Sequence, residues 1–117
     1  MLVFSRTVDS SVMIGDDLEI QVVELVPFSV RLRAEWRTMG GRLTKVMFDL
    51  TRSIGESVEL GGGVNCLVVD IRAEKVRLGF MVPMNVAVHR REVWEAIRRE
   101  RLEAIRHERD NDIDLDP

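Results

Sequence analysis

The feature that most constrains the fold of this chain is an internal repeat with a spacing of 46 residues. When residues 1–34 are aligned with residues 47–80, ten positions are identical and no gap is needed. Self-similarity at a fixed spacing is typical of a duplicated structural unit. We therefore predict two copies of one unit, and the alternative is a single β domain with two similar sets of strands. The identical pairs are Met1/Met47, Arg6/Arg52, Ser11/Ser57, Val12/Val58, Gly15/Gly61, Val22/Val68, Val23/Val69, Val30/Val76, Arg31/Arg77 and Leu32/Leu78.

Each unit has the pattern of a small antiparallel sheet. Residues 18–26 alternate between polar and apolar side chains over much of their length, as a half-buried strand does. Gly61-Gly62-Gly63 lacks the lysine and the helix that follow a phosphate-binding loop, so we predict a hairpin turn there. The predicted strands of the first unit are residues 2–6, 11–14, 18–26 and 29–34, and the second unit repeats this order.

The two units differ after their fourth strand. The second unit continues through Pro83 into a short predicted strand, Val86–Arg90, and a charged helix follows that is predicted to end near Glu108. In the first unit, Thr44 stands in place of the final arginine, and Gly40-Gly41 favours a turn over a stiff strand. The last strand of the first unit is therefore predicted to be degenerate.

The charge of the chain bears on its partners. A net charge of −3 argues against strong nonspecific attraction to nucleic acid. Four of the 20 acidic residues lie within the last eight positions, and without them 16 acidic residues face 17 basic ones. Binding to nucleic acid is thus expected to depend on a localised basic patch.

Cysteine usage and hydropathy indicate the compartment. The single Cys66 excludes an internal disulfide and fits a reducing environment. No apolar run approaches the roughly 20 residues of a membrane-spanning helix, and no signal peptide opens the chain. We expect a soluble, cytoplasmic protein that makes no membrane contact.

The run Pro83–Glu92 resembles the last strand of the carbon storage regulator (CsrA/RsmA) family, whose pattern ends in V-A-V-H-R-E. Met1–Arg6 and Val12–Asp17 are similar to the beginning of the same family, and Met47–Glu56 is a second such beginning. The resemblance covers about residues 1–34 and 47–97 and implies a small, dimeric, RNA-binding translational regulator in which two chains interlace.

The resemblance implies a mostly β fold: a CsrA-like intertwined antiparallel β-barrel or sandwich, formed as a pseudo-dimer from two repeats, with one C-terminal α-helix. Residues 1–109 are expected to form one domain. Repeat one is residues 1–46, with the degenerate last strand, and repeat two is residues 47–97 plus the helix to about residue 109. The acidic tail 110–117 is expected to be disordered.

In the family, each RNA surface combines the first strand of one unit with the last strand of the other. The arginine at the end of the last strand implies a guanidinium fork on a guanine. For Arg6 the alternative is a surface ion pair with a nearby acid, and His89 is as readily structural. The residues expected at the competent site are Phe4, Ser5, Arg6, Pro83, Val86, Val88, His89 and Arg90.

A second surface is expected to be crippled or repurposed. It would place Leu50, Thr51 and Arg52 beside the degenerate segment Arg42–Lys45. If the pairing of units is reversed, Arg52 replaces Arg6 in the competent site. The sequence departs from the family at Arg91, which replaces the usual acid after the key arginine, and at other positions of the first strands.

The resemblance implies a regulator that binds GGA-containing loops in messenger RNA leaders or small regulatory RNAs and represses translation, with one competent site per chain. Single-stranded loops expose the base edges that such recognition needs. The alternative is a protein-interaction module that kept the fold and lost RNA binding. Its partners would be another CsrA-like chain or a flagellar assembly factor, and association of two copies into a homodimer is also open.

No pattern of catalytic residues is visible in the sequence. The only histidines are His89 and His107, and no Ser/His/Asp set, carboxylate dyad or metal-ligand spacing occurs. We therefore expect no enzyme activity, cofactor, metal or DNA partner. The cluster Arg98–Arg101 is typical of a solvated helix face, with RNA contact as the alternative.

Overall fold

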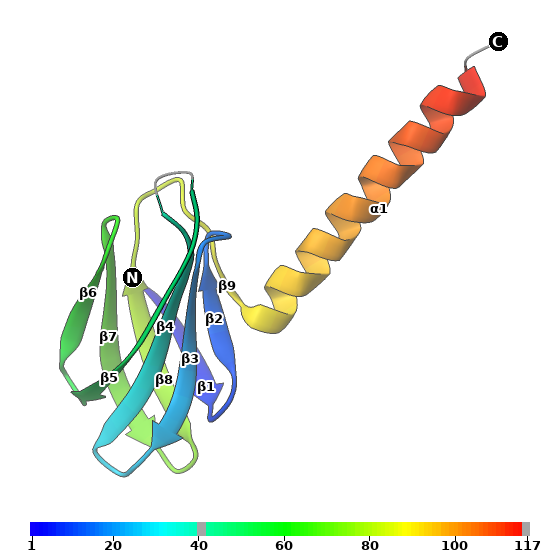
Figure 1. Ribbon diagram of the computed structural model, residues 1–117. Coiled ribbons are helices and arrows are strands. Elements are labelled where there is room, and N and C mark those ends of the chain that lie inside the picture. The colour runs from blue at the N-terminus through cyan, green and yellow to red at the C-terminus, as the bar shows by residue number, and fades with distance from the viewer. Residues whose placement is uncertain (40–41, 116–117) are drawn as a thin grey trace.

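The computed structural model describes residues 1–39 and 42–115. Within these residues, nine strands form two antiparallel sheets that face each other, and one helix projects away from the sandwich (Figure 1). This confirms the predicted mostly β fold with a C-terminal helix. The elements are β1 (Leu2–Thr7), β2 (Ser11–Ile14), β3 (Leu18–Leu25), β4 (Ser29–Met39), β5 (Arg42–Ser53), β6 (Ser57–Gly61), β7 (Val64–Arg72), β8 (Lys75–Met81), β9 (Val88–Arg90) and α1 (Arg91–Leu115).

The two repeat units are interlaced, because each sheet contains strands of both. The four-stranded sheet has the order β1-β8-β7-β6, and the five-stranded sheet has the order β5-β4-β3-β2-β9. Strand β1 of the first unit pairs with β8 of the second. In return, β9 of the second unit pairs with β2 of the first, and β5, which contains the start of the second unit, pairs with β4 of the first. The predicted intertwined pseudo-dimer is therefore the arrangement of this single chain.

The sequence repeat is also a repeat of backbone geometry. Asp9 N donates to Val22 O at 2.7 Å, and Gly55 N donates to Val68 O at 2.8 Å. A register shift follows each acceptor, between Val22 and Glu24 in one unit and between Val68 and Asp70 in the other. Both donors have a positive φ, 72° for the aspartate and 85° for the glycine. The same turn and the same β-bulge therefore recur 46 positions apart.

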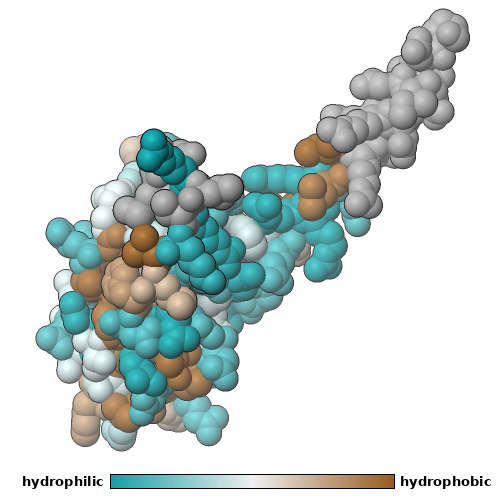
Figure 2. Space-filling model, in the orientation of Figure 1, coloured by the Kyte–Doolittle hydropathy of each residue, from teal (hydrophilic) through white to brown (hydrophobic). Residues whose placement is uncertain are grey.

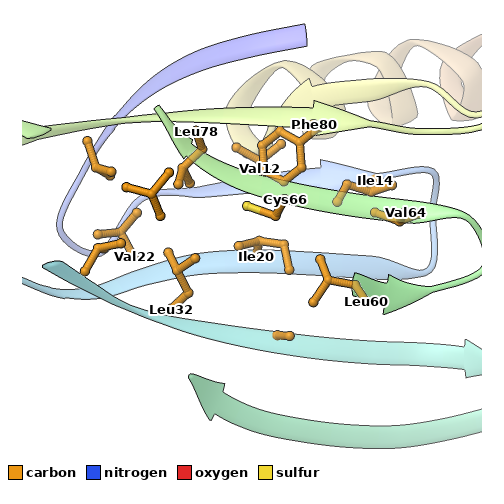
Figure 3. Close-up of a cluster of buried hydrophobic side chains, with 14 of the residues drawn as sticks. Val12, Ile14, Ile20, Val22, Leu32, Leu60, Val64, Cys66, Leu78 and Phe80 are labelled. Atoms are coloured by element: carbon orange, nitrogen blue, oxygen red, sulfur yellow. The ribbon is translucent and has the colours of Figure 1, made fainter. Parts of the chain in front are cut away.

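The core lies between the two sheets and consists of aliphatic side chains with one phenylalanine and one cysteine (Figure 3). It forms because the strands alternate: in β3, Leu18, Ile20 and Val22 are buried while their neighbours are half-buried. Burial raises the pKa of the Cys66 thiol to about 12, so this side chain acts as a small apolar group. Repeat-related pairs that are both buried include Val22/Val68, Val30/Val76 and Leu32/Leu78.

The junction between the units differs from the prediction. The fourth strand was expected to end at Ala34, but β4 continues to Met39, and β5 runs from Arg42 to Ser53 without interruption. The end of the first unit and the start of the second therefore form one strand, paired with β4 from Ser29↔Ser53 to Met39↔Arg42. No glycine or proline occurs between Arg42 and Ser53 to break it. The turn predicted at Gly40-Gly41 lies outside the described residues.

Helix α1 is longer than predicted. It continues beyond Glu108 to Leu115, and no glycine or proline interrupts the sequence over this range. It thus includes residues 110–115 of the segment expected to be disordered, while Asp116 and Pro117 lie outside the described residues. Within the described part of the chain, no helix is long and apolar enough to cross a membrane.

Candidate functional site

Strand β9 forms the edge of the five-stranded sheet. It is shorter than predicted, because Val86 and Ala87 lie in the preceding loop, where Val86 N donates to Pro83 O at 3.0 Å. Pairing with β2 places Val88 opposite Ile14 and Arg90 opposite Val12. Val88 is therefore buried in the core, whereas the arginine that ends the strand is exposed.

Strand β1 is the edge of the other sheet, and an ion pair connects it to the residues that follow β9. Arg6 donates from Nη1 to Glu92 Oε1 at 2.9 Å and from Nη2 to Glu92 Oε2 at 3.1 Å. Its Nη1 also donates to Ser11 O at 3.2 Å. The structure thus connects the first strand to the start of α1, two residues after the end of β9.

The Arg6 guanidinium is largely removed from solvent. Arg6 is only 9% exposed, and its Nε is buried without a hydrogen-bond partner in the described residues. The hydrogen bond from Arg6 holds the pKa of Glu92 at about 2, helped by the backbone amide of Glu92 itself. The predicted alternative for Arg6, an ion pair with an acid, is therefore what the structure contains, although the arginine is buried and not at the surface.

The other predicted residues of β1 face in different directions. Phe4 packs against the core in an edge-to-face contact with Phe80, with 6.2 Å between ring centroids. Ser5 is exposed and lies opposite Arg77 of β8, which is also exposed. The sequence reasoning did not assign Arg77 to the site, because only the strand register reveals that it neighbours Ser5.

The predicted residues of the β8–β9 loop contact both the sandwich and the start of the chain. Pro83 and Val86 line a pocket together with Met1 and Leu2. Val86 is half-buried against the core, and a Cβ at Gly63 would come within 3.2 Å of the ring of Pro83. Ser5 and Arg90 are exposed, and the half-buried His89 lies opposite Met13, on the face of the five-stranded sheet that α1 covers.

The arrangement predicted for the second surface is wrong. Leu50, Thr51 and Arg52 lie on β5, the same strand as the segment Arg42–Lys45, so the two cannot lie side by side. The reversed pairing is wrong too, because β5 and β9 are at opposite ends of the five-stranded sheet. Arg52 donates to Ser57 O at 3.2 Å, as Arg6 does to Ser11 O. The position equivalent to Glu92 is Val46, so no carboxylate clamps Arg52.

A network of charges fastens α1 to the outer face of the five-stranded sheet. Glu19 of β3 accepts hydrogen bonds from Arg37 Nη2 at 2.6 Å and Ser11 Oγ at 2.7 Å, and Arg91 Nη1 lies 2.7 Å from its Oε1. Burial opposes ionisation of Glu19, but the donors and the two arginine charges more than offset it, so its pKa is lowered. Met13 is fully buried beside this network. Arg91, a departure from the family pattern, thus has a structural partner.

Trp94 of α1 is surrounded by cations. Its Nε1 donates to Asp16 Oδ1 at 2.9 Å, and the guanidinium carbons of Arg98, Arg91 and Arg37 lie 4.8, 5.3 and 5.9 Å from its ring. Such distances are within the range of cation–π attraction. In Figure 2, the surface where α1 leaves the sandwich is mainly hydrophilic, while hydrophobic side chains show on the sandwich itself. Sequence analysis did not identify this cluster, because Arg37 is far from the helix in the sequence.

The described residues contain no group of three or more His, Cys, Asp or Glu side chains placed to hold a metal ion. What the edge offers instead is a cation, a hydroxyl, an imidazole and the free backbone groups of two edge strands. Edge strands present unpaired N–H and C=O groups that can bind a ligand. This chemistry suits recognition of polar, planar or anionic groups.

Comparison with known proteins gives an independent result. Residues 47–99 match the model of a global regulator protein family, CsrA. The chain is 47% identical over 53 residues to the translational regulator CsrA of Rhodopirellula baltica, which is 45% of this chain and 76% of that protein. It is 38% identical over 56 residues to the translational regulator CsrA of Brachyspira hyodysenteriae, which is 48% of this chain and 68% of that protein. No solved structure matches the chain with statistical significance.

Proposed function

Because this chain belongs to the CsrA family of global regulators, we propose that it is an RNA-binding translational regulator whose binding site is the edge formed by β1 and β9. The observation that carries this proposal is the state of Arg90. It is exposed at the end of an edge strand, and its side chain forms no ion pair or hydrogen bond with other described residues. Because β9 fixes the backbone of Arg90 and no side-chain partner occupies its guanidinium, this cation is available to an RNA ligand.

The ligand we propose is a GGA-containing loop in a messenger RNA leader. Arg90 would bond the O6 and N7 atoms of a guanine, a contact worth roughly 1–3 kcal/mol of discrimination. The free backbone groups of β9 and of the loop before it would read further base edges, and Pro83, Val86, Val88, His89 and, on β1, Phe4 and Ser5 would shape the surroundings of the site. Occupancy of the leader by the protein would then repress translation in the cytoplasm.

Two features support a role for Arg6 in positioning instead of direct contact with RNA. Its Nη1 and Nη2 already donate hydrogen bonds to Glu92 and to the carbonyl oxygen of Ser11, so few donors of Arg6 remain for a ligand. The same contacts tie β1 to the start of α1, immediately after Arg90. We therefore assign Arg6 the task of holding the two edge strands in a fixed relation.

We further propose one site of this kind per chain, within a single pseudo-dimeric domain made of both repeats. The support for a single site is that the two sheets differ in their number of strands and in their terminal strands. The five-stranded sheet ends in β9, whereas in the four-stranded sheet β6 is the terminal strand among the described residues. The equivalent of β9 in the first unit, residues 42–44, is part of β5 in the five-stranded sheet, so it does not pair with β6.

The test is titration of a hairpin RNA with GGA in its loop against the same hairpin with CCA. We expect tight binding to GGA only, with one RNA per chain and about tenfold weaker binding for Arg90→Ala at unchanged thermal stability. Solution mass measured on the same samples would distinguish one chain from two. Equal affinity for both loops at moderate salt would exclude the proposed function.

A further inference from the structure

A pocket of about 220 Å³ lies where helix α1 leaves the sandwich. It is formed by the β2–β3 turn, the loop before β9 and one face of the helix, and its lining includes Asn85, His89, Trp94, Arg98 and Arg101. Arg98 and Arg101 lie three positions apart, so they project from the same side of α1. The pocket is therefore built partly by residues of β9 and partly by the helix.

The pocket carries an excess of positive charge. Arg98 stacks on Trp94 at 4.8 Å from the ring, and neither Arg98 nor Arg101 forms an ion pair in the part of the chain that the structure describes. By contrast, the neighbouring Arg91 is neutralised by Glu19 and Glu95. Asp16, the acidic residue of the lining, accepts the indole N–H of Trp94. Two guanidinium groups thus remain for an anion.

The pocket lies on the other face of the strand that ends in Arg90. His89 lines the pocket, and the side chain of Arg90, which we place on the guanine, points to the opposite face of β9. Because β9 is an edge strand, an RNA strand that crosses this edge would reach the pocket as it leaves the recognised bases. Its phosphodiester groups match the planar, forked donors of arginine.

We propose that this pocket binds phosphodiester groups of the same RNA outside the GGA element, with Arg98 and Arg101 as the ligand groups. Trp94 is a positioning residue, because it holds Arg98 over its ring and is itself fixed by Asp16. This inference rests on the proposed function and adds to it a second contact that follows the backbone and carries no base specificity. Helix α1 is thereby part of the binding surface.

The test uses two single-stranded RNAs and three variants of the full chain. One RNA contains little beyond GGA, and the other is extended by about six nucleotides on each side, within the usual reach of single-strand sites. We expect the extension to increase the affinity of the unmodified protein about tenfold, and the double variant Arg98→Ala/Arg101→Ala to remove this increase. Arg99→Ala deletes the same charge from the same helix outside the pocket and should retain it.

Salt dependence provides a second readout. Each phosphate contact with single-stranded RNA contributes about 0.7 to the slope of log affinity against log salt, so the double variant should lower the slope by about 1.4. A double variant that behaves as Arg99→Ala does, while Arg90→Ala still loses GGA binding, would overturn the inference and leave the proposed function intact. A protein that binds neither RNA would overturn both. Stabilisation by inorganic phosphate that the double variant loses, without a change in RNA affinity, would assign the pocket to a free anion and overturn the inference.

Discussion

The ion pair between Arg6 and Glu92 gives the most informative single perturbation of the structure. Replacing Glu92 by Gln leaves the guanidinium of Arg6, which is 9% exposed, without its carboxylate. Removing one partner from a fully buried pair costs about 3–5 kcal/mol. Here the Glu92 side chain is 61% exposed, so water reaches the pair and screens it. We expect the free energy of unfolding to fall by roughly 1–2 kcal/mol.

Thermal denaturation followed by circular dichroism measures this effect. For a domain of this size, 1–2 kcal/mol corresponds to a fall in Tm of about 4–10 °C at neutral pH. Glu95→Gln removes an exposed i,i+4 partner of Arg91 and serves as the control, with an expected change within about 0.5 kcal/mol.

The stability difference between the native chain and Glu92→Gln should also depend on pH in a predictable direction. The pKa of Glu92 falls from 4.5 to about 2 on folding, so its contribution is present above pH 4.5 and is lost as the pH decreases from 4.5 toward 2. The stability difference between the native chain and Glu92→Gln should therefore narrow across this range. A difference that stays constant down to pH 2 would refute the assigned ion pair.

The RNA affinity of Glu92→Gln distinguishes two possible roles of Arg6, which are positioning of the strands and direct contact with RNA. If Arg6 positions the strands, Glu92→Gln loosens the β1/β9 edge and weakens GGA binding by a few-fold. If Arg6 is an RNA contact held back by Glu92, the same change frees it and strengthens binding. Stronger binding by Glu92→Gln with an unchanged Tm would contradict our reasoning.

Further predictions concern the other parts of the structure. Arg52→Ala should leave RNA affinity within about twofold, because Arg52 lies at the end of the five-stranded sheet opposite β9; a tenfold loss in RNA titration would contradict this. Leu32→Ala should lower the free energy of unfolding in urea by about 2–5 kcal/mol, since Leu32 is fully buried in the core. Glu19→Ala should release the start of α1 and shift Trp94 fluorescence to longer wavelength, as water reaches the indole. The Cys66 thiol, with a pKa of about 12, should resist alkylation at pH 8 until the chain is unfolded.

Much of the fold could be predicted from the sequence, because the repeat indicates the strands and the resemblance to the CsrA family implies their interlaced pairing. Residues such as Val22 and Val68 occupy equivalent buried positions, and the turn glycines mark where strands end. The single strand β5 could not be predicted in this way. In the sequence repeat, residues 42–46 are the end of the first unit and Met47 is the start of the second. Backbone pairing with β4 continues across this boundary, because the whole segment is extended.

The candidate site stays a prediction, and the directions of its side chains could not be predicted from the sequence. The resemblance places Phe4, Arg6 and Arg90 together, and in the structure Arg6 of β1 binds Glu92, two residues after Arg90. Alternation along β1 then turns Phe4 and Arg6 inward and Ser5 outward. The cations around Trp94 come from β4 and α1, so no spacing within the sequence indicates that they meet.

The exchange of strands between the two halves has a consequence for synthesis. While the chain emerges from the ribosome, β1 has no partner until β8, some 70 residues later, has been made. The last strand to appear, β9, must then find β2 near the other end of the chain. Pairings so distant in sequence are slow to form. The nascent polypeptide therefore carries an unsealed sandwich until β8 and β9 have both emerged, and the two edges of the proposed RNA-binding surface form only then.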